Sequence, residues 1–147
     1  MKGRSRALTV VVPALDEADS LPALLADLDP FAADVVVVDG GSTDGTDAIA
    51  RAAGARVVRS PRGRGIQLRA GAEASDGDWL LFLHADSRLD KVAVRSIVDF
   101  TRQRSDRDFG HFRFTLAGAR RFYRFIETGQ RIRQGLFGLV YGDQGML

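Results

Sequence analysis

Short apolar runs alternate with helix-like patterns along the first hundred residues of the chain. Four runs are rich in β-branched or bulky apolar residues, as buried strands are, and they span residues 7–15, 34–39, 55–60 and 78–86. The segments that follow them predict helices over residues 19–28 and 44–54, within residues 61–75, and over residues 90–100. Near-continuous apolar strands that alternate with helices predict an α/β fold, with a doubly wound, mainly parallel sheet and helices on both faces. We expect residues 1–147 to form a single domain.

The last third of the chain has a different charge and composition. Beyond residue 105, the pattern predicts one more strand at residues 108–116 and an aromatic-rich helix near residues 120–131. Residues 1–100 carry 12 Lys and Arg against 15 Asp and Glu, whereas residues 101–147 carry 9 against 4. The basic, aromatic segment 109–137 is most simply a solvated helix face beside an aromatic core stripe. The alternative is a contact surface for the membrane, a lipid-linked acceptor or a phosphorylated acceptor.

Composition narrows the range of partners and compartments. The net charge is only +2, so nucleic acid is not expected as a partner. There is no cysteine, which fits a reducing compartment. The apolar stretch near the N-terminus is too short for a signal peptide, and no run reaches the ~18 apolar residues of a membrane-spanning helix. We therefore expect a cytoplasmic protein, with the basic segment 109–137 as a peripheral contact to the membrane.

Acidic residues follow three of the predicted strands. They are Asp16 and Glu17 after the first strand, Asp39 after the second, and Asp86 after the fourth. In open α/β sheets, ligands bind just outside the carboxyl ends of the strands. A carboxylate that ends four consecutive valines is partly desolvated and rigidly held, so Asp39 is predicted to accept hydrogen bonds from a ligand, and the two glycines after it allow close approach. The simpler alternative is that "DGGSTDGT" is a turn in which Asp44 or Thr46 caps the next helix.

Several nucleotide and phosphate sites are excluded by their motifs. The first strand is followed by "PALDE", which lacks the glycines of a dinucleotide-binding fingerprint, and no Walker A loop is present. A phosphatase with an aspartate nucleophile at Asp39 would need a second aspartate where Gly41 stands. A zinc cluster is not expected either, because the chain has two histidines, His84 and His111, and no cysteine.

A site for a divalent metal and a diphosphate fits the remaining residues. Mg²⁺ is bound by one or two carboxylates together with substrate phosphates, and Asp86 at the end of "LFLHAD" suits that role. The arginines and glycines of "PRGRGIQLRAG" could hold phosphate oxygens in front of a helix N-terminus. A solvated basic loop is the alternative for that segment.

Four segments together carry a family resemblance. In chain order they are "VVVPALDEADSLPALL", "DVVVVDGGSTDGT", "GRGIQLRAGAEASDGDWLLFLHADSRL" and "YGDQG". They resemble a family 2 glycosyltransferase with the Rossmann-like GT-A fold, and most closely the small bacterial arsenosugar-biosynthesis-type subgroup. The resemblance covers nearly the whole chain. It implies transfer of a sugar, with inversion, from a nucleotide-diphosphate sugar to an acceptor hydroxyl, assisted by Mg²⁺ or Mn²⁺.

The resemblance also implies roles for individual residues in binding the nucleotide sugar. The turn that contains Pro13, Ala14 and Glu17 resembles the first nucleotide-contacting segment of the family. Asp39 matches the aspartate that hydrogen-bonds the base, and Arg64 lies in the segment whose basic residue approaches the nucleotide.

The metal motif of the family is matched only in part. Asp86 matches the last aspartate of its D-x-D sequence and is the expected metal ligand. His84 stands in place of the first aspartate, as it does in the subgroup, and either hydrogen-bonds ribose or phosphate or orients a neighbour.

The general base of the family is an acid that follows a "GDQG"-like segment, whereas this chain stops at "YGDQGML". We therefore expect the base and the C-terminal part of the domain to lie beyond residue 147, and the 147 residues to bind nucleotide and metal with little turnover. Asp143 is the alternative base, although shaping the acceptor pocket fits its position better. Two other functions remain open, a non-catalytic nucleotide-sugar-binding module and a nucleotidyltransferase.

Overall fold

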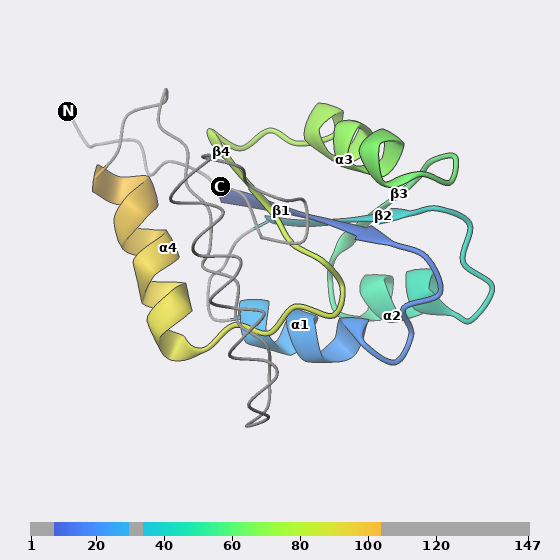
Figure 1. Ribbon diagram of the computed structural model, residues 1–147, viewed down its shortest axis with the longest axis horizontal. Helices are drawn as coiled ribbons and strands as arrows, with labels where there is room; N and C mark the ends of the chain where they lie inside the picture. The colour runs from blue at the N-terminus through green and yellow to red at the C-terminus, as the bar shows by residue number, and fades with distance from the viewer. Residues whose placement is uncertain (1–7, 30–33, 104–147) are drawn as a thin grey trace, which may run out of the picture.

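The computed structural model describes residues 8–29 and 34–103, so the strand and helix expected within residues 108–131 lie outside its described part. Four strands alternate with four helices along these residues (Figure 1). The strands are β1 (Leu8–Ala14), β2 (Asp34–Asp39), β3 (Arg56–Arg59) and β4 (Trp79–Phe82). The helices are α1 (Leu21–Leu28), α2 (Thr46–Ala52), α3 (Arg64–Glu73) and α4 (Lys91–Gln103).

The four strands form a parallel sheet in the order β3-β2-β1-β4. The first three strands add in one direction, and the chain then crosses over to place β4 on the other side of β1. Such a reversal is a topological switch point, outside whose strand ends α/β proteins bind their ligands. The switch point here lies at the carboxyl ends of β1 and β4.

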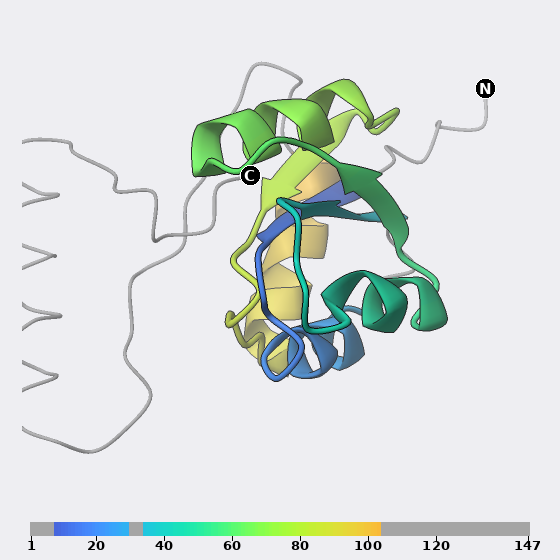
Figure 2. The same cartoon turned by 90° about the vertical axis from the view of Figure 1, so that its right-hand side faces the viewer.

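Helices cover both faces of the sheet, as the alternation of apolar and polar segments predicts. Helices α1, α2 and α4 lie on one face and α3 on the other (Figures 1 and 2). Successive valines of each strand point to opposite faces. Val10, Val12 and Val37 belong to the core under α1, α2 and α4, whereas Val11 and Val38 belong to a smaller core under α3. The predicted α/β fold with a doubly wound parallel sheet is therefore confirmed.

Helix α3 packs unusually close to the sheet. Its buried residues are Gln67 and Gly71, and it has no apolar stripe of large side chains. A Cβ atom added at Gly71 would lie 2.2 Å from Cγ1 of Val11 and 3.0 Å from Cγ2 of Val38. Only glycine fits at this contact, because carbon atoms in van der Waals contact are about 3.5–4.0 Å apart.

Strand β4 is shorter than the apolar pattern predicts. Pairing with β1 ends at Val11 and Phe82, and one further bond joins the Leu83 amide to the Val11 carbonyl at 3.1 Å. The chain then turns, because the Ser87 amide donates to the His84 carbonyl at 3.0 Å. The prediction of a strand as far as residue 86 is wrong, since Leu83 and Ala85 are buried without being part of the sheet.

Pro13 explains why β1 and β4 separate. The carbonyl of Val11 faces β4, whereas that of Ala14 faces β2 and accepts the Gly40 amide at 2.9 Å. Because backbone groups of successive residues point to alternate sides of a strand, the nitrogen of Pro13 faces β4. Proline has no N–H to donate, so the ladder between β1 and β4 cannot continue there.

The helix ends agree with the predicted signals in part. Helix α2 begins at Thr46 rather than at residue 44, and its N-cap is Gly45, which offers no side-chain cap, so the expected cap by Asp44 or Thr46 is not formed. Asp44, the residue before the cap, accepts the Thr46 amide through Oδ1 at 3.0 Å. Gly54 follows the helix with φ of +84°, the left-handed conformation that glycine readily adopts after a helix. Among the described helices, none is both long and apolar enough to cross a membrane.

Candidate functional site

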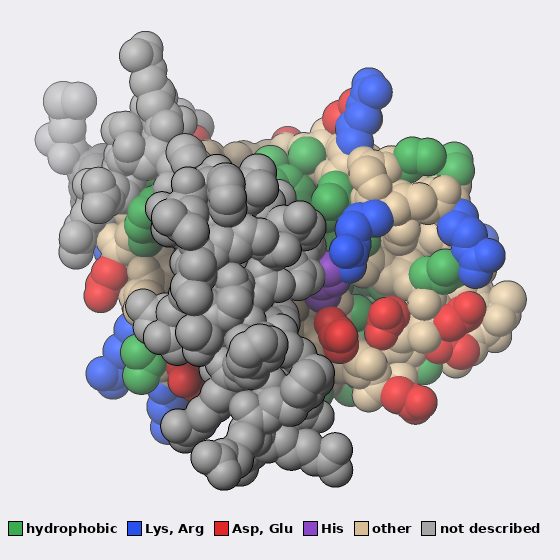
Figure 3. Space-filling view, in the orientation of Figure 1, with side chains coloured by type: hydrophobic (Ala, Val, Ile, Leu, Met, Phe, Trp, Pro, Cys, Tyr) green, Lys and Arg blue, Asp and Glu red, His purple; other side chains and the backbone are tan. Residues whose placement is uncertain are grey.

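A cavity of about 210 Å³ opens where β1 and β4 separate. Three segments line it, namely the end of β1 with the loop that follows it, the first turn of α3 and the turn after β4. Six of the seven residues predicted to bind the donor are among its lining residues, and these are Pro13, Ala14, Glu17, Arg64, His84 and Asp86. On this face of the molecule a histidine lies between basic and acidic side chains (Figure 3). The cavity is therefore lined by groups of both charges.

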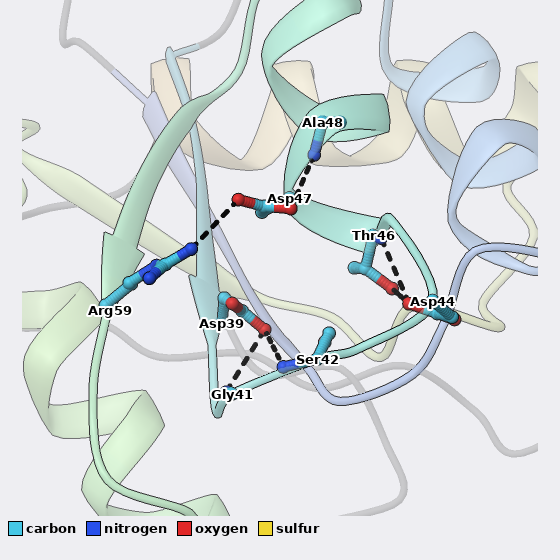
Figure 4. Close-up of polar contacts among 8 residues, drawn as sticks. All are labelled: Asp39, Gly41, Ser42, Asp44, Thr46, Asp47, Ala48 and Arg59. Atoms are coloured by element: carbon cyan, nitrogen blue, oxygen red, sulfur yellow. Dashed lines mark hydrogen bonds and ion pairs between the residues drawn. The ribbon is translucent and has the colours of Figure 1, made fainter.

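Asp39, the seventh predicted residue, does not line this cavity. It ends β2 directly opposite Ala14 and is only 1% exposed. Its Oδ1 accepts the amides of Ser42 at 2.9 Å and Gly41 at 3.3 Å (Figure 4). One half of the carboxylate thus holds the turn that follows the strand, and Oδ2 lies outside these two bonds.

The Asp39 carboxylate is held in its ionised form. Burial opposes ionisation, but the hydrogen bonds from Ser42 and Gly41 and the charge of Arg59 outweigh it and lower the pKa of Asp39 below its ordinary value. Arg59, the last residue of β3, itself forms an ion pair at 3.2 Å with Asp47 in the first turn of α2 (Figure 4). An ionised Asp39 can act only as a hydrogen-bond acceptor.

The polar turn at residues 42–46 fastens the loop that carries Glu17. Three backbone amides of this loop donate to side chains of the turn. Asp16 donates to Ser42 Oγ, Glu17 to Thr46 Oγ1 and Ala18 to Asp44 Oδ2, each at 2.9 Å. In return, the Thr43 amide donates to Asp16 Oδ1 at 2.8 Å. Asp16 has φ of +53°, which is uncommon for a residue other than glycine. This network explains why a strand of valines is followed by residues that cannot pack, since the turn holds one wall of the cavity.

The sequence analysis did not identify Gln67 as part of the site. This side chain is 5% exposed, and its Nε2 donates to the Ala14 carbonyl at 2.8 Å and to the Val38 carbonyl at 2.9 Å. It therefore joins α3 to the ends of β1 and β2. Its spacing offered a signal, because Gln67 lies one helical turn before Gly71 and so on the buried face of α3.

Arg64 and His84 are joined by a hydrogen bond across the cavity. The guanidinium NH2 of Arg64 contacts Nδ1 of His84. A guanidinium can only donate, so Nδ1 of His84 is the acceptor of this bond. The backbone amide of His84 donates in turn to Ser87 Oγ at 3.1 Å, which fixes the turn that carries Asp86.

The residues of the cavity fit a divalent metal that arrives together with a diphosphate. Within the described residues, no group of three or more histidine or acidic side chains could hold an ion. Asp86 is exposed at the cavity and supplies one carboxylate. Mg²⁺ is commonly bound in this way, through one or two carboxylates, waters and substrate phosphates.

Hydrogen bonds to Asp27 of α1 hold the segment that follows the turn after β4. Asp27 accepts two bonds from Arg88, at 2.7 and 3.1 Å, and one from the Leu89 amide at 3.0 Å. The bonds from Arg88 lower the pKa of Asp27, although burial acts in the opposite direction. Asp143 and the basic, aromatic segment 109–137 fall outside the described residues.

Comparisons with known proteins point to a single family. The family model described as Glycosyl transferase family 2 matches residues 9–139. The chain is 30% identical to glycosyltransferase AglJ of Haloferax volcanii over 140 residues, and 42% identical to an uncharacterized glycosyltransferase of Mycobacterium tuberculosis over 93 residues. These alignments cover 93% and 63% of this chain, but 46% and 42% of the relatives.

A solved structure shares the fold. Glucosyl-3-phosphoglycerate synthase from Mycobacterium tuberculosis, in complex with Mn²⁺, uridine diphosphate and glucosyl-3-phosphoglycerate, matches with a TM-score of 0.52 and 30% identity. The match covers 56% of this chain and 36% of that protein. The chain thus spans less than half the length of these relatives.

Proposed function

The chain belongs to glycosyltransferase family 2, and on this basis we propose that its cavity binds a nucleotide-diphosphate sugar whose sugar is transferred to an acceptor hydroxyl with inversion. The observation that carries the proposal is the meeting of Arg64, His84 and Asp86 at the topological switch point of the sheet. The related synthase, which binds Mn²⁺ and uridine diphosphate in its solved complex, supports the same class of donor.

The cavity residues, and Asp39 beside the cavity residue Ala14, have distinct tasks in this proposal. Arg64, at the first residue of α3, attracts the diphosphate by its charge and donates hydrogen bonds to its oxygens. Asp39 accepts a hydrogen bond from the base through Oδ2, because Oδ1 is engaged by the turn. The Pro13–Glu17 segment contacts the nucleoside from the end of β1.

Asp86 holds the divalent metal together with the diphosphate, and the metal neutralises charge on the leaving group. Inversion follows when the acceptor hydroxyl attacks from the side opposite to the leaving diphosphate. This step needs a carboxylate that removes the hydroxyl proton. The rigid strand ends contribute by holding the donor in line for that attack.

Calorimetric titration of the purified chain tests the proposal. UDP-glucose, GDP-mannose and the matching diphosphates are added with Mn²⁺ and with EDTA, and we expect saturable binding of at least one of them. Arg69→Gln serves as the control, because Arg69 lies on the same helix as Arg64 but pairs with Glu73 outside the cavity. The proposal is wrong if no nucleotide diphosphate or nucleotide sugar binds under either condition. NMR analysis of the anomeric configuration of any glycoside formed tests inversion.

A further inference from the structure

Arg64 differs from the other arginines that contact a side chain in the described residues. Arg56, Arg59, Arg69 and Arg88 each pair with a carboxylate. Arg64 instead donates to an imidazole nitrogen of His84, and no described carboxylate lies in an ion pair with it. The hydrogen bond orients the guanidinium without compensating its charge.

Arg64 is exposed to solvent at the start of a helix, where it adds to the positive potential of the helix N-terminus. Arg64 is the first residue of α3, where the helix dipole disfavours a cation. The preceding Gly63 provides no side-chain cap to the helix. Two sources of positive potential therefore point toward one end of the cavity, and an anionic group placed there would interact favourably with both.

We propose that His84 is a positioning residue that holds Arg64 as an uncompensated cation, so that the cavity binds a diphosphate even without metal. This inference rests on the proposed function and adds that Arg64 and the metal each supply part of the positive charge that binds the diphosphate. An acidic residue at position 84 would form an ion pair with Arg64 and leave the diphosphate dependent on the metal. With histidine there, Arg64 binds the diphosphate, and the metal at Asp86 strengthens the binding.

Substitutions at position 84 separate charge from hydrogen bonding. His84→Asn supplies an uncharged acceptor for Arg64, His84→Asp supplies a charged one, and His84→Ala supplies none. In EDTA, we expect His84→Asp to weaken uridine diphosphate binding about tenfold or more, the scale of one charge-assisted hydrogen bond. His84→Asn should stay within about threefold of wild type, and His84→Ala should fall between the two.

Titration with Mn²⁺ distinguishes this role from a structural one. We expect His84→Asp to regain affinity with Mn²⁺, because a second carboxylate near Asp86 favours the cation, so the ratio of affinities with Mn²⁺ and with EDTA should rise. A merely structural defect would lower both affinities in parallel, and thermal melting checks that each variant is folded. Arg64→Gln should lose about tenfold in EDTA, whereas Arg69→Gln should change less than twofold.

The outcomes also separate this inference from the proposed function. If wild type binds uridine or guanosine diphosphate but His84→Asp binds as tightly as wild type in EDTA, the inference is wrong and the proposed function stands. It is equally wrong if His84→Asn and His84→Asp lose the same affinity, or if the ratio does not rise. If wild type binds neither diphosphate, in Mn²⁺ or in EDTA, both the inference and the proposed function are wrong.

Discussion

Replacing Gly71 by alanine should destabilise the protein, although alanine favours helices. An added Cβ would lie 2.2 Å from Cγ1 of Val11, at least 1 Å closer than van der Waals contact allows. Val11 and Val38 are both fully buried and stiff at χ1, so they cannot turn aside, and α3 has to move away from the sheet. Overpacking of this kind costs about 1–3 kcal/mol, against about 1 kcal/mol gained from helix propensity. Because the 2.2 Å approach places this substitution in the upper part of that range, at about 2–3 kcal/mol, we expect the free energy of unfolding to fall by about 1–2 kcal/mol.

Gly65 provides a matched control on the same helix. A Cβ atom there would meet nothing within 4 Å, so only the propensity term applies and Gly65→Ala should be neutral or stabilising by up to about 1 kcal/mol. Urea denaturation of the full chain, followed by circular dichroism, measures the difference between the two variants. The close packing of α3 is refuted if Gly71→Ala is as stable as wild type or matches Gly65→Ala.

The same substitution should also affect the cavity, because α3 carries Arg64 and Gln67 into it. A shift of the helix away from Val11 would lengthen the bonds from Gln67 to the strand ends. We therefore expect weaker binding of uridine diphosphate by folded Gly71→Ala than by Gly65→Ala. Equal affinity would show that the first turn of α3 is positioned independently of the contact at Gly71.

Three further substitutions test the bonds around the site. Gln67→Met should lower stability by about 1–3 kcal/mol in urea denaturation, because two buried carbonyls lose their shared donor; an unchanged midpoint would contradict the role of this bond. Asp27→Asn should lower stability at pH 6 by up to about 1 kcal/mol. Since the folded-state pKa of Asp27 is depressed, its contribution is present above the unfolded pKa and is lost as pH falls through the folded one, so the deficit should shrink and then vanish as the pH falls below about 4. Asp86→Asn should abolish the gain in uridine diphosphate affinity from Mn²⁺ without weakening binding in EDTA; a retained gain would place the metal elsewhere.

The sheet was predictable from the sequence because its signal is local. Runs such as "VVVV" before Asp39 are both apolar and β-branched, which is typical of strands that are buried on both faces of a parallel sheet. The extent of β4 was not predictable in the same way. Leu83 and Ala85 are 3% and 2% exposed, so the apolar pattern continues although the backbone has left the sheet. Burial fixes the pattern, whereas strand pairing depends on a neighbour from another part of the chain.

For the site, the strand-end acids and the basic loop were recognisable, but their interactions were not. The sequence could not show that Asp16 and Asp44 bond to loop amides 26 or 27 residues away, because such contacts depend on how two loops meet. Nor could it show that Oδ1 of Asp39 accepts the Gly41 and Ser42 amides of the turn that follows its strand. Gln67 carried a usable signal in its helical spacing from Gly71, yet a buried amide needs partners that only the folded strand ends supply.

Pro13 affects both the fold and the site, because it lacks the backbone N–H that would continue the pairing of β1 with β4. A proline within a central strand ordinarily argues against that strand, because each neighbour needs donors from it. In β1 the missing N–H affects only the edge of the strand that pairs with β4. The carbonyl of Ala14 still pairs with β2, whereas the nitrogen of Pro13 faces β4 and ends that ladder. The strands separate there, and the opening is lined by Pro13, Ala14, His84 and Asp86. The residue that weakens the sheet therefore creates the space in which we propose that the donor binds.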